Sequence, residues 1–157
     1  MAEIESEDEP GAGPARHLTG AWFWAAPALG VALAVFHLFA ALVPALAELT
    51  RNTIHFGGFA LLCALWFPAA QAASGGAWRW LDLLLGLTVA AAALYLSQAE
   101  SAIYDRGVRL IALDWAAGIV VILGALEFTR RTAGLIIPVL MLLALGYVGW
   151  WGQFVGG

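Results

Sequence analysis

The sequence predicts an all-α integral membrane protein, with about five transmembrane helices in antiparallel up-down order behind a disordered acidic N-terminal tail. Hydrophobic residues make up 62% of the 157 residues and charged residues only 11%, and the mean hydropathy is +0.85. A soluble domain of this size does not need so much apolar surface to fill one core. The apolar residues also gather into long runs separated by short polar stretches. We therefore expect a single transmembrane helical domain over residues 21–157.

Residues 1–20 are expected to form a disordered, solvated tail. Their acids repel one another, and four prolines and glycines between positions 10 and 14 disfavour regular structure. The formal net charge of −4 comes largely from these acids, which are Glu3, Glu5, Glu7, Asp8 and Glu9. The tail lacks the basic region and the short apolar stretch of a cleavable signal, so the first hydrophobic segment is expected to be retained.

The predicted spans cover residues 22–47, 54–70, 78–97, 110–128 and 132–154. Roughly 20 apolar residues, rising about 1.5 Å each, match a hydrocarbon core of about 30 Å. Pro27 and Pro44 fall near the two ends of the first span, where a lost backbone hydrogen bond costs least. Glu48–Thr53 is expected to be a short polar turn, and Ser97–Arg109 the longest polar connection, compatible with a short helix lying in the interface.

Tryptophans support this division independently, because indole rings favour the membrane–water interface. All eight fall near the ends of the predicted spans: Trp22, Trp24, Trp66, Trp78 and Trp80 on the side of the N-terminus, and Trp115, Trp150 and Trp151 on the other. The seven basic residues are all arginines and divide four to three between the two sides, which does not determine the orientation. They form no continuous patch, which argues against binding of nucleic acid.

The fourth span carries charges at its two ends, with Asp114 in the opening turn and Glu127, Arg130 and Arg131 near the closing turn. These positions complement the helix dipole and keep the charges near the headgroups. Glu127 precedes the two arginines by three and four positions, so local ion pairs on one helix face are expected. A second interpretation is that Asp114 or Glu127 faces another subunit and pairs across helices, since ionisable groups near lipid tend to face protein.

Small residues mark two candidate surfaces for close helix packing: Ala26, Gly30 and Ala34 in the first span, and Gly86 and Ala90 in the third. Arg51 and His55 are further candidates for anchoring at the interface or contacting a subunit. Cys63 is the only cysteine, so no disulfide can form within the chain.

The sequence contains no recognisable catalytic, substrate-binding or metal-binding motif, and no cofactor is expected. Histidines raise the alternative of a haem-binding membrane redox subunit. His17 belongs to the tail, however, and in the predicted spans His37 lies roughly 14 Å deeper than His55. These two rings are therefore expected not to face each other, as a bis-histidine haem would require. A self-associating pore is disfavoured because no span carries a polar stripe.

The order of the motifs resembles the N-terminal membrane region of the fused permeases of tripartite ATP-independent periplasmic (TRAP) transporters of the TAXI type. The matching pieces are Arg51–Phe56, RNTIHF; Ala91–Leu96, AAALYL; and Leu113–Gly149, in which Leu126–Gly134, LEFTRRTAG, is the most specific. The fused proteins continue into a much larger transport segment, which is missing after Gly157. Either the two parts are separate polypeptides, which is the simpler interpretation, or the sequence is a truncated fused permease.

The resemblance implies a small, non-catalytic scaffold subunit of an ion-driven secondary transporter. Its partners would be the large elevator-type membrane subunit, a periplasmic TAXI-type substrate-binding protein and membrane lipid. It would lie in the bacterial or archaeal cell (inner) membrane as a multi-pass protein with a cytoplasmic N-terminus. The alternative is the small subunit of a tricarboxylate-type tripartite transporter, which is similar in size and role but has no stretch that matches LEFTRRTAG.

Overall fold

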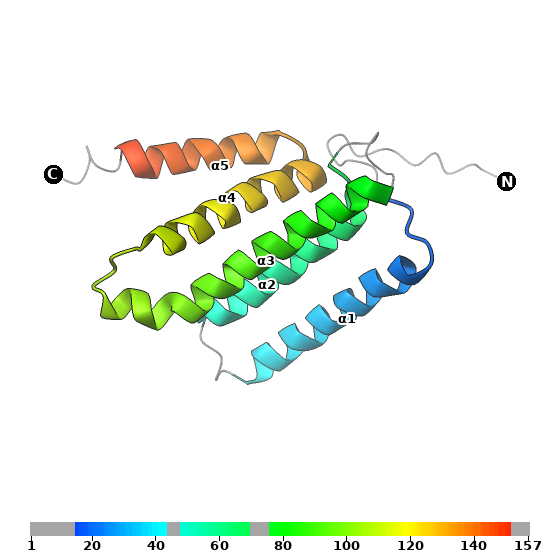
Figure 1. Ribbon diagram of the computed structural model, residues 1–157, viewed down its shortest axis with the longest axis horizontal. Coiled ribbons are helices and arrows are strands. Elements are labelled where there is room, and N and C mark those ends of the chain that lie inside the picture. The colour runs from blue at the N-terminus through cyan, green and yellow to red at the C-terminus, as the bar shows by residue number, and fades with distance from the viewer. Residues whose placement is uncertain (1–14, 44–47, 70–75, 152–157) are drawn as a thin grey trace.

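The computed structural model describes residues 15–43, 48–69 and 76–151, and every regular element in these ranges is helical. The elements are α1 (Ala21–Leu42), α2 (Glu48–Trp66), α3 (Gly76–Asp105), α4 (Ala112–Ala133), α5 (Ile136–Gly146) and a short π-helix, η2 (Tyr147–Trp151). Consecutive α-helices run in opposite directions, as Figure 1 shows. The prediction of an all-α chain in up-down order is confirmed for this part of the sequence.

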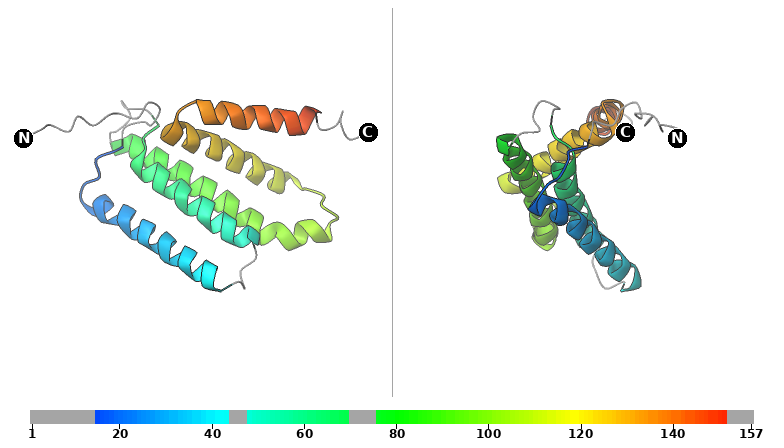
Figure 2. Two further views of the ribbon diagram at one scale, coloured as in Figure 1. Left: turned by 180° about the vertical axis from the view of Figure 1, so that it is seen from behind. Right: turned by 90° about the vertical axis from the view of Figure 1, so that its right-hand side faces the viewer.

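Helices α2, α3 and α4 pack against one another and form the centre of the molecule. Helix α1 packs mainly against α2, and α5 mainly against α4. The two outer helices therefore lie on opposite edges of the central three, and they diverge from each other in the right-hand view of Figure 2. Each of them has one principal neighbour within the chain.

Small residues bring the central helices close together. Val89 on α3 is fully buried, with Ala60, Ala64 and Phe128 from α2 and α4 around it. A Cβ atom placed on Gly86 would lie 2.8 Å from the Cβ of Ala64. Such spacing lets backbones approach closely and increases van der Waals contact, which is the main source of helix association in lipid.

The boundaries of α1 and α2 differ from those predicted. Helix α1 ends at Leu42 rather than at residue 47, and Val43 is extended, with φ −119° and ψ 94°. The next residue is Pro44, and a residue before proline avoids the helical region because the proline ring clashes with it. Helix α2 then begins at Glu48, so the predicted polar turn Glu48–Thr53 is wrong: these residues form its first turns.

The predicted polar connection Ser97–Arg109 is also wrong over most of its length. Helix α3 continues without interruption to Asp105, because the polar residues after Ser97 are compatible with a helix. It ends where Gly107 adopts a positive φ of 66°. The amide of Gly107 then donates to the carbonyl of Tyr104, and that of Val108 to the carbonyl of Ile103. A glycine in this conformation is a common end signal of helices.

Three of the described helices, α1, α3 and α4, are long and apolar enough to cross a membrane. Helix α2 begins with a mostly polar sequence, ELTRNT, and α5 has only 11 residues before the π-helix. Of the fifth span predicted over residues 132–154, residues 132 and 133 belong to the end of α4, Gly134 breaks the helix with φ 74°, and α5 and η2 cover residues 136–151. Residues 152–154 lie outside the described residues. Five helices are thus present in the described residues, and three of them have the character of membrane spans.

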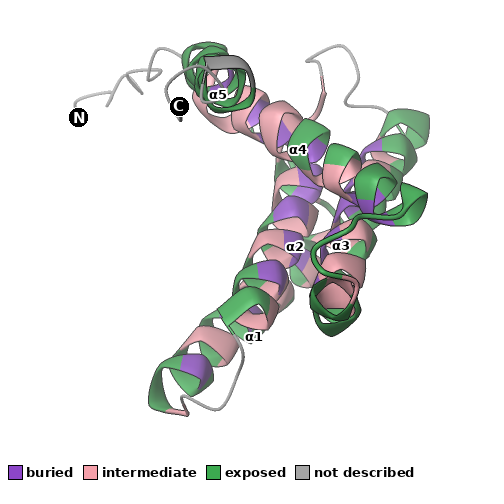
Figure 3. Cartoon of the chain, turned by 90° about the vertical axis from the view of Figure 1, so that its left-hand side faces the viewer, coloured by how far each residue is buried: buried purple, intermediate pink, exposed green. Residues whose placement is uncertain are grey.

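Exposed large apolar side chains are most frequent on α5, and α1, α3 and α4 also carry several each. In Figure 3 the buried segments lie where α2, α3 and α4 face one another, whereas α5 is almost entirely exposed. On α5 only Pro138 is buried, and on α1 only Ala26, Leu33 and Ala40 are. Such apolar outer faces match the interior of a lipid bilayer or the surface of another apolar protein.

Candidate functional site

Asp82 is the centre of a buried cluster of charges at the end of the molecule where α2 and α4 end and α3 begins. Its two carboxylate oxygens accept hydrogen bonds from different arginines, Oδ2 from Arg16 at 2.6 Å and Oδ1 from Arg131 at 2.8 Å. All three side chains are at most 5% exposed. An isolated charge is costly to bury, and this arrangement offsets the cost by pairing and hydrogen bonding.

The two arginines also hold the C-terminal end of α2. Arg16 donates from Nη1 to the carbonyl of Ala64, and Arg131 from Nη1 to the carbonyl of Phe67. The last carbonyls of a helix have no partner inside it, so cations are well suited to this place. Residues from the N-terminal segment, α3 and α4 thereby meet at one end of α2.

Glu127 makes the local ion pairs that its spacing predicts. It accepts two hydrogen bonds from Arg130 and one from Arg131, all at 2.8 Å. Arg131 therefore bridges Glu127 and Asp82, while Arg130 also donates to the carbonyl of Ala69. We call Arg16, Asp82, Glu127, Arg130 and Arg131 the Asp82 network.

The start of the described chain belongs to this network and not to a disordered tail. Arg16 is 5% exposed, and its backbone amide donates to the carbonyl of Trp66 at 2.7 Å. The prediction of a solvated tail is therefore wrong at Arg16, whose guanidinium pairs with Asp82 and with the carbonyl of Ala64. The acidic residues at positions 3–9 lie outside the described residues.

Asp114 occupies the opposite end of the molecule, where it joins α3 to α4. Its carboxylate accepts hydrogen bonds from the hydroxyl of Tyr95 and from Nη2 of Arg106, both at 2.7 Å. It also accepts the backbone amide of Ile111 at 3.0 Å, which caps the start of α4. Asp114 is 2% exposed. All of these hydrogen-bond partners lie within this chain, and contact of Asp114 with another subunit stays a prediction.

The two histidines of α1 and α2 face each other, which corrects the prediction from the sequence. Nε2 of His37 lies 2.6 Å from Nδ1 of His55, with a ring centroid distance of 4.8 Å. The error follows from the helix boundaries. Because α1 ends at Leu42 and α2 begins at Glu48, the two residues lie about 8 Å and about 10 Å from the connection between the helices.

The small residues singled out in the sequence fall into two groups. Gly86 is buried against Ala64, and Ala90 contacts Gly57, so both lie where α2 and α3 meet. Of the three small residues predicted in α1, only Ala26 is buried; Ala34 is exposed, and a Cβ on Gly30 would have no neighbour within 4 Å. The contacts of α1 instead follow Ala26, Leu33 and Ala40, a spacing of seven residues.

Arg51 is half-buried near the start of α2, and His55 is exposed one turn later. No ion pair involves Arg51 within the described part of the chain. Close by, the hydroxyls of Thr50 and Ser97 lie 3.0 Å apart and connect α2 to α3. Arg51 is therefore not held by an ion pair as Arg16 and Arg131 are.

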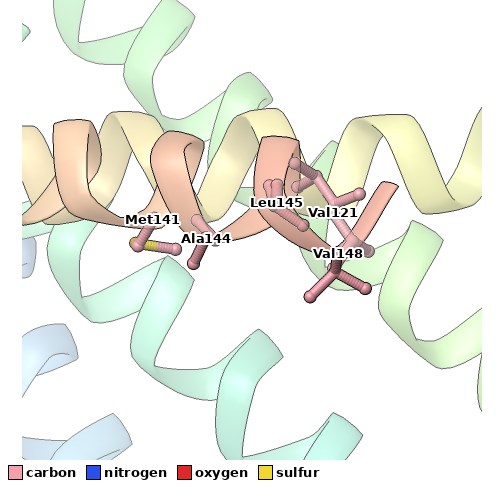
Figure 4. A pocket seen from close by; sticks show the side chains of 7 residues that line it. Val121, Met141, Ala144, Leu145 and Val148 are labelled. Atoms are coloured by element: carbon pink, nitrogen blue, oxygen red, sulfur yellow. The ribbon is translucent and has the colours of Figure 1, made fainter. Parts of the chain in front are cut away.

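A groove of about 390 Å³ lies between α4 and the helices α5 and η2 (Figure 4). Apolar side chains line it: Val121, Ile122, Ala125, Met141, Ala144, Leu145 and Val148. Such a lining suits hydrocarbon and offers no hydrogen-bonding partner to a polar solute. Among the described residues, no group of three or more His, Cys, Asp or Glu side chains is placed to hold a metal ion.

Pairs between residues far apart in the sequence were not predicted. Asp82 and Tyr95 pair with residues 49 and 19 positions away, and Arg16 with one 66 positions away. A signal for Asp82 was present, since a carboxylate inside an apolar helix requires a partner. The residues near Asp82 in the sequence do not show which residue that partner is.

The charged residues of the two ends thus bind the central helices together, and the histidine pair joins α1 to them.

Comparison of the chain with protein-family models, with curated proteins and with solved structures found no match.

Proposed function

We propose that this chain is the small membrane subunit of a TRAP-type secondary transporter, where it serves as a non-catalytic scaffold. It would anchor the large elevator-type transport subunit during solute uptake. The Asp82 network is the observation that carries this proposal. The charges of the LEFTRRTAG stretch, on which the resemblance chiefly rests, connect α3, α4 and the end of α2 to one another.

A scaffold must resist the forces exerted by a moving neighbour, and buried ion pairs at both ends favour such rigidity. Breaking one partner of a buried pair costs about 3–5 kcal/mol, so rearrangement of these helices would be expensive. The Asp82 network and the Asp114 contacts restrain opposite ends of α4. The central helices are therefore suited to remain stationary while another subunit moves.

The outer helices would supply the contact surface. Helix α5 exposes apolar side chains on nearly all sides, and α1 exposes most of its length. In this proposal one of these faces contacts the large subunit and the other faces lipid. The protein would be a multi-pass protein of a bacterial or archaeal cell membrane, with a TAXI-type binding protein as the periplasmic component.

A pull-down of the tagged chain from its native membrane in mild detergent tests the proposal. The expected result is a stoichiometric, larger hydrophobic protein, whose mass and peptide sequence distinguish a TRAP-type large subunit from a tricarboxylate-type one. Recovery of the chain alone, as a monodisperse homo-oligomer, would contradict the scaffold function. An absorption spectrum of the same preparation tests the redox alternative, which requires a haem Soret band.

A further inference from the structure

We propose that His37 and His55 form a two-histidine binding site for a divalent transition metal ion, Cu²⁺ or Zn²⁺, that links α1 to α2. The two imidazoles come from different helices, and the contact between Nε2 of His37 and Nδ1 of His55 is the polar link between α1 and α2 in the described residues. Imidazole nitrogen is a preferred ligand of both metals.

Hydrogen bonding already orients His37 as a ligand. Its Nδ1 lies 2.6 Å from the backbone carbonyl of Leu33. A carbonyl can only accept, so Nδ1 carries the proton, and in the neutral ring Nε2 carries the lone pair. Metal-bound histidines usually donate their second nitrogen in this way, which sets the tautomer and the ring orientation. The lone pair of His37 is directed at His55 before any metal binds.

The second nitrogen can become available without a change in net charge. In the pair as it stands, Nδ1 of His55 donates its proton to His37. Moving that proton to Nε2 of His55, through solvent, leaves a neutral ring with a lone pair on Nδ1. His55 is exposed, so its ring is free to turn and its far nitrogen can exchange protons. Metal binding then replaces one hydrogen bond by two coordinate bonds.

The distance between the nitrogens is close to that of a chelate. Two imidazoles bound at about 2.0–2.1 Å have nitrogens about 2.9 Å apart at a right angle and about 3.3 Å apart at the tetrahedral angle. The observed separation of 2.6 Å requires a small opening and a rotation of His55. The ring of Phe59 lies 4.7 Å from that of His55 and covers one side of it. Water would complete the coordination on the exposed side.

Binding of Cu²⁺ to the purified full chain in detergent, without a histidine tag, tests this site. Competition with a chromogenic chelator gives the affinity, and electron paramagnetic resonance reports the number of equatorial nitrogens. We expect one tight site with two imidazole nitrogens. His55→Gln keeps a side chain that can donate to His37 and should weaken binding at least about tenfold, with one nitrogen lost. His37→Gln should have the same effect, so that each of the two histidines is tested separately.

His17→Gln is the matched control, because it removes the third histidine and should leave the affinity and the two-nitrogen spectrum unchanged. Zn²⁺ should also raise the Tm of the wild type and of His17→Gln, but not of His55→Gln. The proposal fails if His55→Gln and His37→Gln bind Cu²⁺ as tightly as the wild type, or if binding is lost with His17. Neither outcome depends on the presence of a large transport subunit.

Discussion

Asp82 and Arg131 form a buried ion pair of 2.8 Å between the second turn of α3 and the last turn of α4. The two residues lie 49 positions apart in the sequence. Arg16, from the segment before α1, pairs with the other oxygen of the same carboxylate. Asp82 thus pairs with two buried cations, and it shares Arg131 with Glu127.

Asp82→Asn should therefore destabilise the chain by about 3–5 kcal/mol, because Arg16 would remain buried without a counter-charge and Arg131 would keep only Glu127. Unfolding in mixed micelles, followed by circular dichroism, measures the change. Asp105→Asn is the control, since Asp105 is exposed at the end of the same helix and should change stability by less than about 0.5 kcal/mol. Equal stability of the two variants would contradict the role assigned to Asp82.

Glu127→Ala should cost less, about 1–2 kcal/mol, because each of its arginine partners retains another acceptor. Arg131 keeps Asp82, and Arg130 keeps the carbonyl of Ala69. Co-purification of a partner subunit should be unchanged, since the pairs of Glu127 lie within the chain. A loss of the partner at intact stability would instead show that Glu127 contacts it directly.

Tyr95→Phe should lower stability by about 1.5–3 kcal/mol, because it removes a hydrogen bond to a buried carboxylate. Asp114 would keep Arg106 and the amide of Ile111, so the fold should persist. Tyr104→Phe, at an exposed position of the same helix, should have little effect. A double-mutant cycle of Tyr95→Phe with Asp114→Asn should give a clear coupling energy; strict additivity would refute the hydrogen bond.

Gly124→Ala should destabilise the contact between α3 and α4 by about 1–3 kcal/mol, because a Cβ at Gly124 would clash with the methyl groups of Val89. Gly118→Ala on the same helix has open space around it and should be neutral or slightly stabilising. Val89→Ala should relieve much of the cost in the double variant. Comparison of the unfolding midpoints of these three variants with the wild type provides the test.

The features that the sequence predicted well depend on near neighbours. Glu127 meets Arg130 and Arg131 because residues three and four apart share a helix face, whatever the rest of the fold. Asp114 was expected in the first turn of its helix, and it caps that turn. The all-helical character follows from long apolar runs whose backbone must be hydrogen-bonded internally in lipid.

The tertiary structure alone decided which distant residues meet. His37 and His55 were judged to lie at different depths because the predicted helix ends were wrong by five or six residues, and each residue shifts a side chain by about 1.5 Å along the axis. Likewise, the partners of Asp82 depend on how α3 and α4 pack and on the path of the N-terminal segment. The long apolar runs of the sequence predicted helices, three of which are long and apolar enough to cross a membrane. Packing between the helices determines which charges and imidazoles come together.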